Sequence, residues 1–407
     1  MADYKGKEYL KQLLAKKRAR VLLRYSYYDM KNGIKYLQTL IPSQFMWMAQ
    51  TMGWCGKAVD SLADRLSFRE FKNDKFDLNT IFRMNNLDIL PDSAMLSALI
   101  TSCSFIYISE DETGFPRMQV IDGGNATGII DPITNMLMEG YAVLKRNENK
   151  DAVLEAYFIP GKTEYYQNGK LIRTDEHKAP YALLVPIIYR PDASRPFGHS
   201  RISRACMNQM QGAMRTLLRS EVSAEFYSFP QKYITGLAQD TEFNQYKANM
   251  SSFLNLSKDD EGDSPKLGQF TQQSMSPYID QLRMFAALFA GETGLTMDDL
   301  GFVTDNPSSA DAIKASHENL RLLARKAQKT FSSGFLNAGY LAACVRDKFA
   351  YKREQVYLSK ALWEPVFEPD AAMLSGIGDG AIKINQAVPG YFGTENLRDL
   401  TGIEAEG

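Results

Sequence analysis

The chain has 407 residues, 44% of them hydrophobic and 23% charged, which allows a sizeable core and two or three domains. A formal net charge of −1 excludes a global basic field that attracts nucleic acid, and no apolar run approaches the ~18 residues of a membrane span. The basic N-terminus lacks the features of a secretory signal, and four scattered cysteines are typical of reduced thiols in a cytosolic protein.

Helical spacing dominates the first hundred residues. A helix is predicted over 5–24, where a leucine and valine stripe is flanked by lysines and arginines between residues 11 and 24. Such a helix is either a solvated surface helix or one that faces a partner or nucleic acid. A second helix is predicted near 43–66, on the recurrence of Trp47, Met48, Met52 and Val59. A third is predicted over 77–98, stopped or kinked at Pro91.

Residues 99–190 have a different sequence pattern: short runs of β-branched and aromatic residues alternate with turn residues. This pattern predicts strands. In "YYQNGKLI", Asn168 and Gly169 can adopt the positive φ angles of a type I′ turn, so a tight hairpin is expected there. The "GGNATG" run at 123–128 is interpreted as an ordinary turn rather than a phosphate loop, since no helix signature follows it.

Beyond residue 200 the chain is predicted to be mainly helical. One long helix reaches Pro230 and carries a narrow apolar seam, "QKYITGL" then favours a strand, and a second helix ends near Gly291 and Gly294. A helix of ~38 residues, about 55 Å long, follows Asn306. The seam residues of the first long helix are Ile202, Cys206, Met210, Ala213, Leu217 and Ala224. A strand region from 354 to 369 and two short helices, 370–386 and 394–400, are expected after that.

The sequence offers no recognisable catalytic motif. Phosphate-loop, H-E-x-x-H, C-x-x-C and G-x-S-x-G patterns are missing. His177, His199 and His317 have no neighbouring pattern of a catalytic triad, so each is predicted to be structural or solvated, with His317 on the exposed side of the long helix. Neither a catalytic, a cofactor-binding nor a metal-binding residue is therefore assigned.

The stretch "GLTMDDLGFVTDNPSSADAIKASHENL" (294–320) concentrates acidic residues without the regular spacing of a calcium loop. Asn306, Ser308 and Asp311 are interpreted as caps of the following helix. Capping does not explain the preceding acidic link, residues 294–305, which joins two long helices. The apolar side chains of this link, Met297, Leu300 and Phe302, are expected to be exposed. A loop between two long helices is a candidate moving part. Its candidate functional residues are Met297, Asp298, Asp299, Leu300, Phe302, Thr304 and Asp305.

Four motifs in chain order carry a resemblance to a known family. "FGHSRI" opens the first long helix and "EFYSFP" ends it, "ETGLTMDDLG" contains most of the acidic link, and "NPSSADAI" follows that link. Together they resemble the portal proteins of tailed bacteriophages of the siphophage type. The resemblance implies an α+β portal-type fold with a β-rich wing, two long stem helices, a small α/β clip insert and a very long tunnel helix.

The resemblance also implies a division of the chain. Residues 1–199 correspond to the wing, 200–228 and 275–293 to the stem helices, 229–274 to the clip, 294–307 to the tunnel loop, 308–347 to the tunnel helix, and 348–407 to returning wing strands with a reduced or truncated crown. The acidic link would then face a channel. Candidate clip contacts are Lys258, Asp259, Asp260, Glu261 and Asp263.

As a member of this family, the protein would be a non-enzymatic ring without cofactors, of twelve subunits at one capsid vertex of the virion, assembled in the host cytoplasm. Double-stranded DNA would enter and leave through it. Its other partners would be the terminase large subunit, a head-tail connector, the scaffold and the major capsid protein, with no membrane. A link without Lys or Arg between 294 and 307 fits such passage, because Lys and Arg would grip phosphates.

Two alternatives remain at this point. The first is a metal-dependent cytosolic hydrolase that uses the carboxylates of Asp298, Asp299 and Asp305. It predicts tight binding of a divalent metal. The second is a nucleic-acid adaptor that uses the basic helix at residues 11–24. It predicts that removal of this helix abolishes DNA binding.

Overall fold

The computed structural model describes residues 4–35, 41, 43–228, 232–235, 266–269, 274–302, 315–367, 369 and 371–403. The chain forms two compact units, and each is described by itself. The first unit comprises Met1–Asn32, Gly53–Met207 and Ala290–Gly407, and the second comprises Gly33–Met52 and Asn208–Phe289. The mixture of helices and antiparallel sheets confirms the predicted α+β class.

The N-terminal part of the first unit is helical, as predicted, but two predicted boundaries are wrong. The first helix, α1 (Lys7–Tyr28), agrees with the prediction. The helix expected over 43–66 is a 3₁₀ turn of the second unit, η1 (Ser43–Met48), followed after a break by α2 (Trp54–Ala63) of the first unit. Trp47 is 78% exposed, so the aromatic spacing there does not mark a buried face.

Pro91 begins a helix and does not end one. The segment predicted as one helix over 77–98 is divided into α3 (Leu78–Met84) and α4 (Leu90–Thr101), with Pro91 in the first turn of α4. A proline is tolerated there because the first amides of a helix have no intrahelical acceptor. The chain breaks earlier, at Asn86, whose φ of 63° is incompatible with a continuing right-handed helix.

The β-rich region forms two antiparallel sheets. A three-stranded sheet has the order β3-β2-β9 and a five-stranded meander has the order β4-β5-β6-β7-β8. The β7–β8 hairpin turns at Asn168 and Gly169 with φ angles of 48° and 79°, which confirms the predicted type I′ turn. The strand bounds are β2 (Cys103–Glu110), β3 (Pro116–Asp122), β4 (Ala126–Ile130), β5 (Leu137–Arg146), β6 (Ala152–Ile159), β7 (Lys162–Gln167), β8 (Lys170–Glu176) and β9 (Leu184–Ile188).

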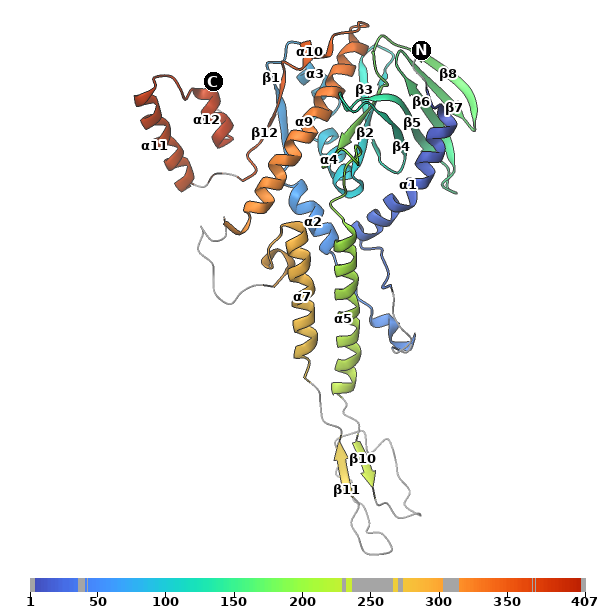
Figure 1. Ribbon diagram of the computed structural model, residues 1–407, viewed down its shortest axis with the longest axis vertical. Helices are drawn as coiled ribbons and strands as arrows, with labels where there is room; N and C mark the ends of the chain where they lie inside the picture. Colours follow the sequence, from blue (N-terminus) through green and yellow to red (C-terminus); the bar gives the residue numbers. More distant parts are fainter. Residues whose placement is uncertain are drawn as a thin grey trace, which may run out of the picture. The chain divides into compact units, whose positions relative to one another are not determined.

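Helices cover these sheets and complete the core of the first unit. Helix α1 packs on the five-stranded sheet, where Leu10 and Leu14 meet Tyr141, Val143 and Tyr157 (Figure 1). Helices α4 and α9 (Glu318–Arg346) both pack on the three-stranded sheet. Its central strand β2 is therefore buried at six consecutive residues, as expected for a strand covered on both faces.

The C-terminal part also belongs to the first unit. A short helix α10 (Arg353–Val356) precedes β12 (Lys360–Trp363), which pairs antiparallel with β1 (Phe68–Lys72), so only part of the predicted strand region 354–369 is a strand. Helices α11 (Ala371–Ala387) and α12 (Thr394–Thr401) confirm the two predicted short helices. None of the described helices is long and apolar enough to cross a membrane.

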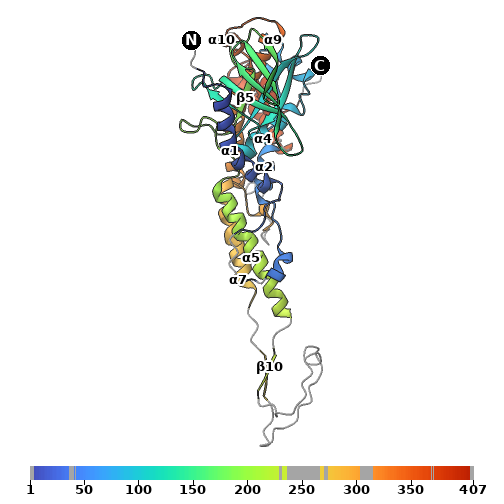
Figure 2. The same ribbon diagram turned by 90° about the vertical axis from the view of Figure 1, so that its right-hand side faces the viewer.

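In the second unit, the main part of α5 (Arg204–Ser228) runs beside α7 (Ser276–Thr293), as both views show (Figures 1 and 2). Gly212 allows this close contact, because a Cβ there would lie 2.5 Å from the ring of Phe285, which would have to shift. Side-chain hydrogen bonds join Thr216 to Gln281 at 2.9 Å and Ser223 to Tyr278 at 2.8 Å.

The predicted seam of α5 is confirmed at most of its positions. Ile202, Cys206, Met210 and Ala213 are buried, although Leu218, not the predicted Leu217, continues the stripe. Strand β10 (Lys232–Thr235) confirms the strand predicted in "QKYITGL" and pairs with β11 (Lys266–Gln269). All five predicted clip contacts (Lys258, Asp259, Asp260, Glu261 and Asp263) lie outside the described residues.

Candidate functional site: the turn after helix α7

Residues 294–302, the acidic turn, begin where α7 ends. Gly294 has φ of 70°, the left-handed conformation that commonly terminates a helix and that glycine adopts without steric cost. A Cβ there would also lie 3.2 Å from Leu323 and 3.5 Å from Asn319 of α9. Gly294 therefore redirects the chain and allows the turn to pass close to α9.

Reciprocal hydrogen bonds hold the middle of the acidic turn. The Asp299 carboxylate accepts hydrogen bonds from the Thr296 backbone N–H and hydroxyl, both at 2.9 Å. In return, the Thr296 hydroxyl accepts a 3.1 Å bond from the Asp299 N–H. This pattern is that of a capping box, here around the 3₁₀ turn η2 (Asp298–Leu300), and it gives Asp299 a local structural role.

The two neighbouring acids have different environments. Asp298 is exposed, whereas Asp299 is half-buried and lies 3.9 Å from His317 Nδ1. The ring of His317 also lies 6.3 Å from that of Phe367, and its side chain is only 19% exposed, so the prediction that His317 is exposed was wrong. The residue occupies the N-cap position of α9 without a capping hydrogen bond from its side chain. Asp298 is therefore the carboxylate of this pair that is free to act on a partner.

The predicted exposure of the apolar residues in the acidic turn is wrong for Leu300. Its side chain is 9% exposed, and Met297 and Phe302 are half-buried. The reason is local: the Leu300 and Phe302 amides bond to the Met297 carbonyl at 3.1 and 3.0 Å, which closes the turn and directs Leu300 inward. The remaining predicted residues, Thr304 and Asp305 of the loop and Asn306, Ser308 and Asp311 of the cap, lie outside the described residues.

A buried arginine anchors the end of α7. The Arg201 side chain donates from Nη2 to the Thr293 carbonyl at 2.6 Å and from Nε to the Ala58 carbonyl at 3.0 Å. A cation beside the last carbonyls of a helix also stabilises the negative end of the helix dipole. Ser203 adds a 2.8 Å hydrogen bond to the Glu292 carboxylate.

Sequence reasoning missed Arg201 and Thr296. Arg201 is part of "FGHSRI", but its hydrogen-bond acceptors are 143 and 92 residues away in the chain, so no local pattern indicates them. The Thr-x-x-Asp spacing of 296–299 was the available signal for the capping box.

One other polar cluster of the first unit contains His199 and Ser194. The two do not bond to each other, because both donate to Asp192, at 2.6 and 2.8 Å. These hydrogen bonds, that of His199 foremost, hold the pKa of Asp192 well below its usual range. Among the described residues no three His, Cys, Asp or Glu side chains are grouped to hold a metal ion.

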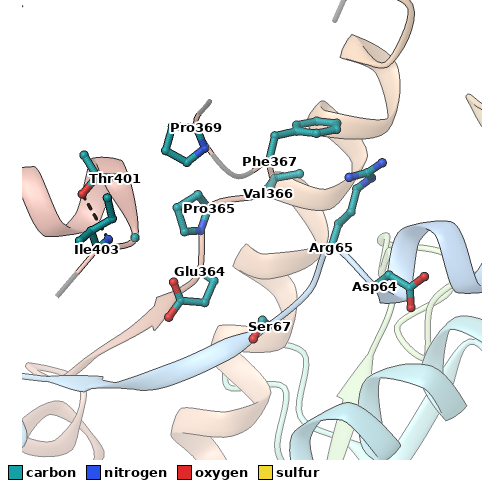
Figure 3. A pocket seen from close by; sticks show the side chains of 11 residues that line it. Asp64, Arg65, Ser67, Glu364, Pro365, Val366, Phe367, Pro369, Thr401 and Ile403 are labelled. Atoms are coloured by element: carbon teal, nitrogen blue, oxygen red, sulfur yellow. Dashed lines mark hydrogen bonds between the residues drawn. The ribbon is translucent and has the colours of Figure 1, made fainter. Parts of the chain in front are cut away.

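A cavity of about 690 Å³ lies between the ends of β1 and β12 and the end of α12 (Figure 3). The Arg65 guanidinium carbon lies 4.2 Å from the centre of the Phe367 ring, and the Thr401 hydroxyl donates to the Leu397 carbonyl at 2.8 Å. The lining residues are Asp64, Arg65, Ser67, Glu364, Pro365, Val366, Phe367, Pro369, Thr401, Gly402 and Ile403.

Comparisons with known proteins agree with the resemblance. Two relatives, each named "Portal protein", come from Mycobacterium phage L5 (25% identical over 322 residues, 72% of this chain and 65% of the relative) and Mycobacterium phage D29 (24% over 344 residues, 78% and 70%). The match thus spans less than two thirds of the L5 protein.

Two solved structures are similar at a low level. A chain of "Virion of native gene transfer agent (GTA) particle" has a TM-score of 0.46 with 11% identity, and covers 96% of this chain and 99% of that chain. A chain of "Neck of native GTA particle computed with C12 symmetry" has a TM-score of 0.45 with 13% identity, and covers 94% and 99%.

The family described as "Phage portal protein, SPP1 Gp6-like" matches residues 8–371, which is more than half of the 407 residues. That range contains the helices α5, α7 and α9, the acidic turn, and Arg201, which anchors the end of α7. The chain belongs to the SPP1 Gp6-like family of phage portal proteins.

Proposed function

We propose that copies of this chain form a closed ring at one vertex of a phage capsid, and that double-stranded DNA enters and leaves through the ring. Membership of the portal family over residues 8–371 supports this function. A ring of identical subunits requires two different, complementary surfaces on each copy, and a rotation that closes. Twelve subunits is the number we propose for the ring in the capsid.

The observation that carries the channel assignment is the charge of the acidic turn. Asp298 is exposed on it, and residues 294–307 contain no Lys or Arg. DNA carries one negative charge per ~1.7 Å of helix axis, and each phosphate that pairs with a cation adds salt-dependent affinity. A constriction lined by repeated copies of Asp298 would leave the phosphates unpaired, so DNA could slide through without being held.

In this proposal the ring is a structural component and not an enzyme. A separate terminase large subunit supplies the energy for packaging, a head-tail connector later binds the same ring, and scaffold and major capsid protein surround it during assembly in the host cytoplasm. The clip contacts proposed at 258–263 would meet the terminase and then the connector. Residues 294–307 would act as the tunnel loop.

Ring formation is tested directly on the purified protein. End-on negative-stain images should show closed rings whose subunits can be counted, and the solution mass should be that of the same assembly. A stable monomer at high protein concentration and at several salt concentrations would contradict the proposal.

The channel assignment is tested with Asp298→Lys. Asp298 is the better position than Asp299, because Asp299 holds the turn together. The variant should assemble normally but package DNA several-fold more slowly, since repeated lysines would retain phosphates. The matched control is Asp379→Lys on α11, an equally exposed acid. Normal packaging by Asp298→Lys would show that the acidic turn does not meet DNA.

A further inference from the structure

Five cations form a cluster that the proposed channel does not use. Lys16, Arg20 and Arg24 follow one another at four-residue spacing on α1, and Lys17 lies on the same side of the helix. The loop before α5 adds Arg195, whose charge acts on Arg24. Lys16, Arg20 and Arg195 are exposed, and the other two are half-buried. These five residues are called the basic face.

No ion pair to a described residue compensates the basic face. Elsewhere on α1, Lys11 pairs with Glu155 at 3.0 Å, whereas none of the five forms an ion pair with any described residue. Two acids nearby have other partners: the Asp122 carboxylate accepts bonds from the Gly124 N–H and the Asn125 amide, at 2.7 and 2.6 Å. The Asp192 carboxylate accepts bonds from His199 and Ser194, and from the backbone N–H of Arg195 at 2.7 Å.

Mutual repulsion within the basic face affects the pKa of its two half-buried members, Arg24 and Lys17. Burial lowers the pKa of Arg24, and the charges of Arg20 and Arg195 lower it further. Burial likewise lowers the pKa of Lys17, with a contribution from Arg20. Holding like charges together costs free energy, and an anion bound on the basic face would offset that cost.

The basic face is also held in place before any ligand arrives. The Arg24 guanidinium donates to the Thr101 carbonyl at 3.1 Å, and Lys17 Nζ lies 5.0 Å from the centre of the Phe197 ring. Leu14 and Val21 bury the adjacent flank of the helix. These supports fix Arg24 and Lys17, so little side-chain entropy of these two residues remains to be lost on binding.

We propose that the basic face binds the phosphate backbone of double-stranded DNA at a site separate from the channel. From Lys16 to Arg24 the helix rises about 12 Å. A DNA duplex presents about seven phosphate charges over that length. A row of unpaired cations on a rigid helix matches such a regular polyanion without reading its sequence. The choice of duplex DNA among polyanions rests on the proposed function, but the binding itself does not need the channel.

The test uses covalently closed circular DNA, which cannot thread a ring that is already closed. Wild-type protein should retain the circle, and Lys16→Gln/Arg20→Gln should bind it on the order of tenfold more weakly. The slope of log affinity against log salt should fall by about 1.8, because two phosphate contacts are lost. The matched control is Lys170→Gln/Lys178→Gln, which removes two exposed cations from the same unit. Equal affinity and slope in the first variant, or an equal loss in the control, would overturn the proposal.

A second arm replaces DNA by poly-L-glutamate of equal charge. If Lys16→Gln/Arg20→Gln loses polyglutamate and keeps the circle, the basic face serves an acidic protein and the proposal fails. End-on images of each variant report ring formation separately. Absence of rings would contradict the proposed function, while the affinity for circular DNA would still decide the role of the basic face.

Discussion

The acidic turn and the basic face are two small charged surfaces on rigid supports, and they differ in how their charges are compensated. In the acidic turn, Asp299 is bonded within the turn and leaves only Asp298 exposed. On the basic face, none of the five cations forms an ion pair with a described residue. The difference teaches that a nearly neutral chain can carry two surfaces of opposite charge; in our proposals, the acidic one leaves phosphates unheld and the basic one binds them.

The supports of the two surfaces differ as well. The basic face rests on a long helix whose apolar side is buried in a core, so a single substitution hardly moves it. The acidic turn depends on a few polar contacts, above all those of Arg201 with the Thr293 and Ala58 carbonyls. A substitution of Arg201 therefore removes the support of the acidic turn without changing the charge of the turn itself.

The largest effect is expected from Arg201→Ala. Removal of the guanidinium leaves two carbonyls without their donor in a region where Arg201 itself is only 7% exposed. Unsatisfied buried groups cost roughly 1–3 kcal/mol each, so the free energy of unfolding should fall by about 3 kcal/mol. Urea denaturation followed by circular dichroism measures the change.

Arg204→Ala is the control for this prediction. Arg204 is exposed in the first turn of α5, where a cation opposes the positive end of the helix, so its removal should leave stability within ~0.5 kcal/mol. A loss in Arg201→Ala no larger than that of the control would show that the anchor of the acidic turn lies elsewhere.

The sequence predicts those parts of the fold that depend on local backbone preferences. Asn168-Gly169 is an example, since positive φ at two successive residues selects the hairpin turn regardless of distant contacts. Pro91 shows the limit, because a proline is compatible with both the end and the first turn of a helix, and only the break at Asn86 decides between them.

The candidate site was predictable in composition but not in geometry. The acidic, cation-free character of 294–307 is a property of the residues themselves. The burial of Leu300 and the anchoring by Arg201 depend on segments far apart in the chain, which no spacing within the motif encodes. Contacts between residues far apart in the chain, such as those of Arg201, therefore cannot be predicted from the local sequence pattern.

An intermediate effect is expected from Asp299→Asn. The amide keeps one acceptor oxygen but loses the charge that strengthens the bonds from Thr296, so the turn should be destabilised by about 1 kcal/mol. Asp298→Asn, which removes the same charge without a comparable bond, should cost nothing measurable. Hydrogen exchange of the Thr296 amide, compared between the two variants, reports the difference. Equal exchange rates would mean that the two acids are equivalent and that only their total charge matters.

The smallest effect is expected from Lys17→Met, which probes what the basic face costs the folded protein. Burial and the charge of Arg20 lower the pKa of Lys17 below its ordinary value near 10.5. The folded state therefore binds fewer protons than the unfolded state between the lowered pKa and about 10.5, so the contribution of Lys17 to stability rises with pH across that window. Methionine removes the titration, and it should raise the free energy of unfolding at pH 7 by up to ~1 kcal/mol.

Urea denaturation of wild type and Lys17→Met at several pH values from 7 to 10 tests this sign. The stability advantage of the variant should be greatest at pH 7 and should shrink as pH rises, because the wild-type lysine loses its costly charge. Lys16→Met provides the control, since Lys16 is exposed on the same helix and should show no such trend. An advantage that grows with pH would mean that the charge of Lys17 stabilises the fold, and the basic face would then lack the internal repulsion that makes it receptive to phosphates.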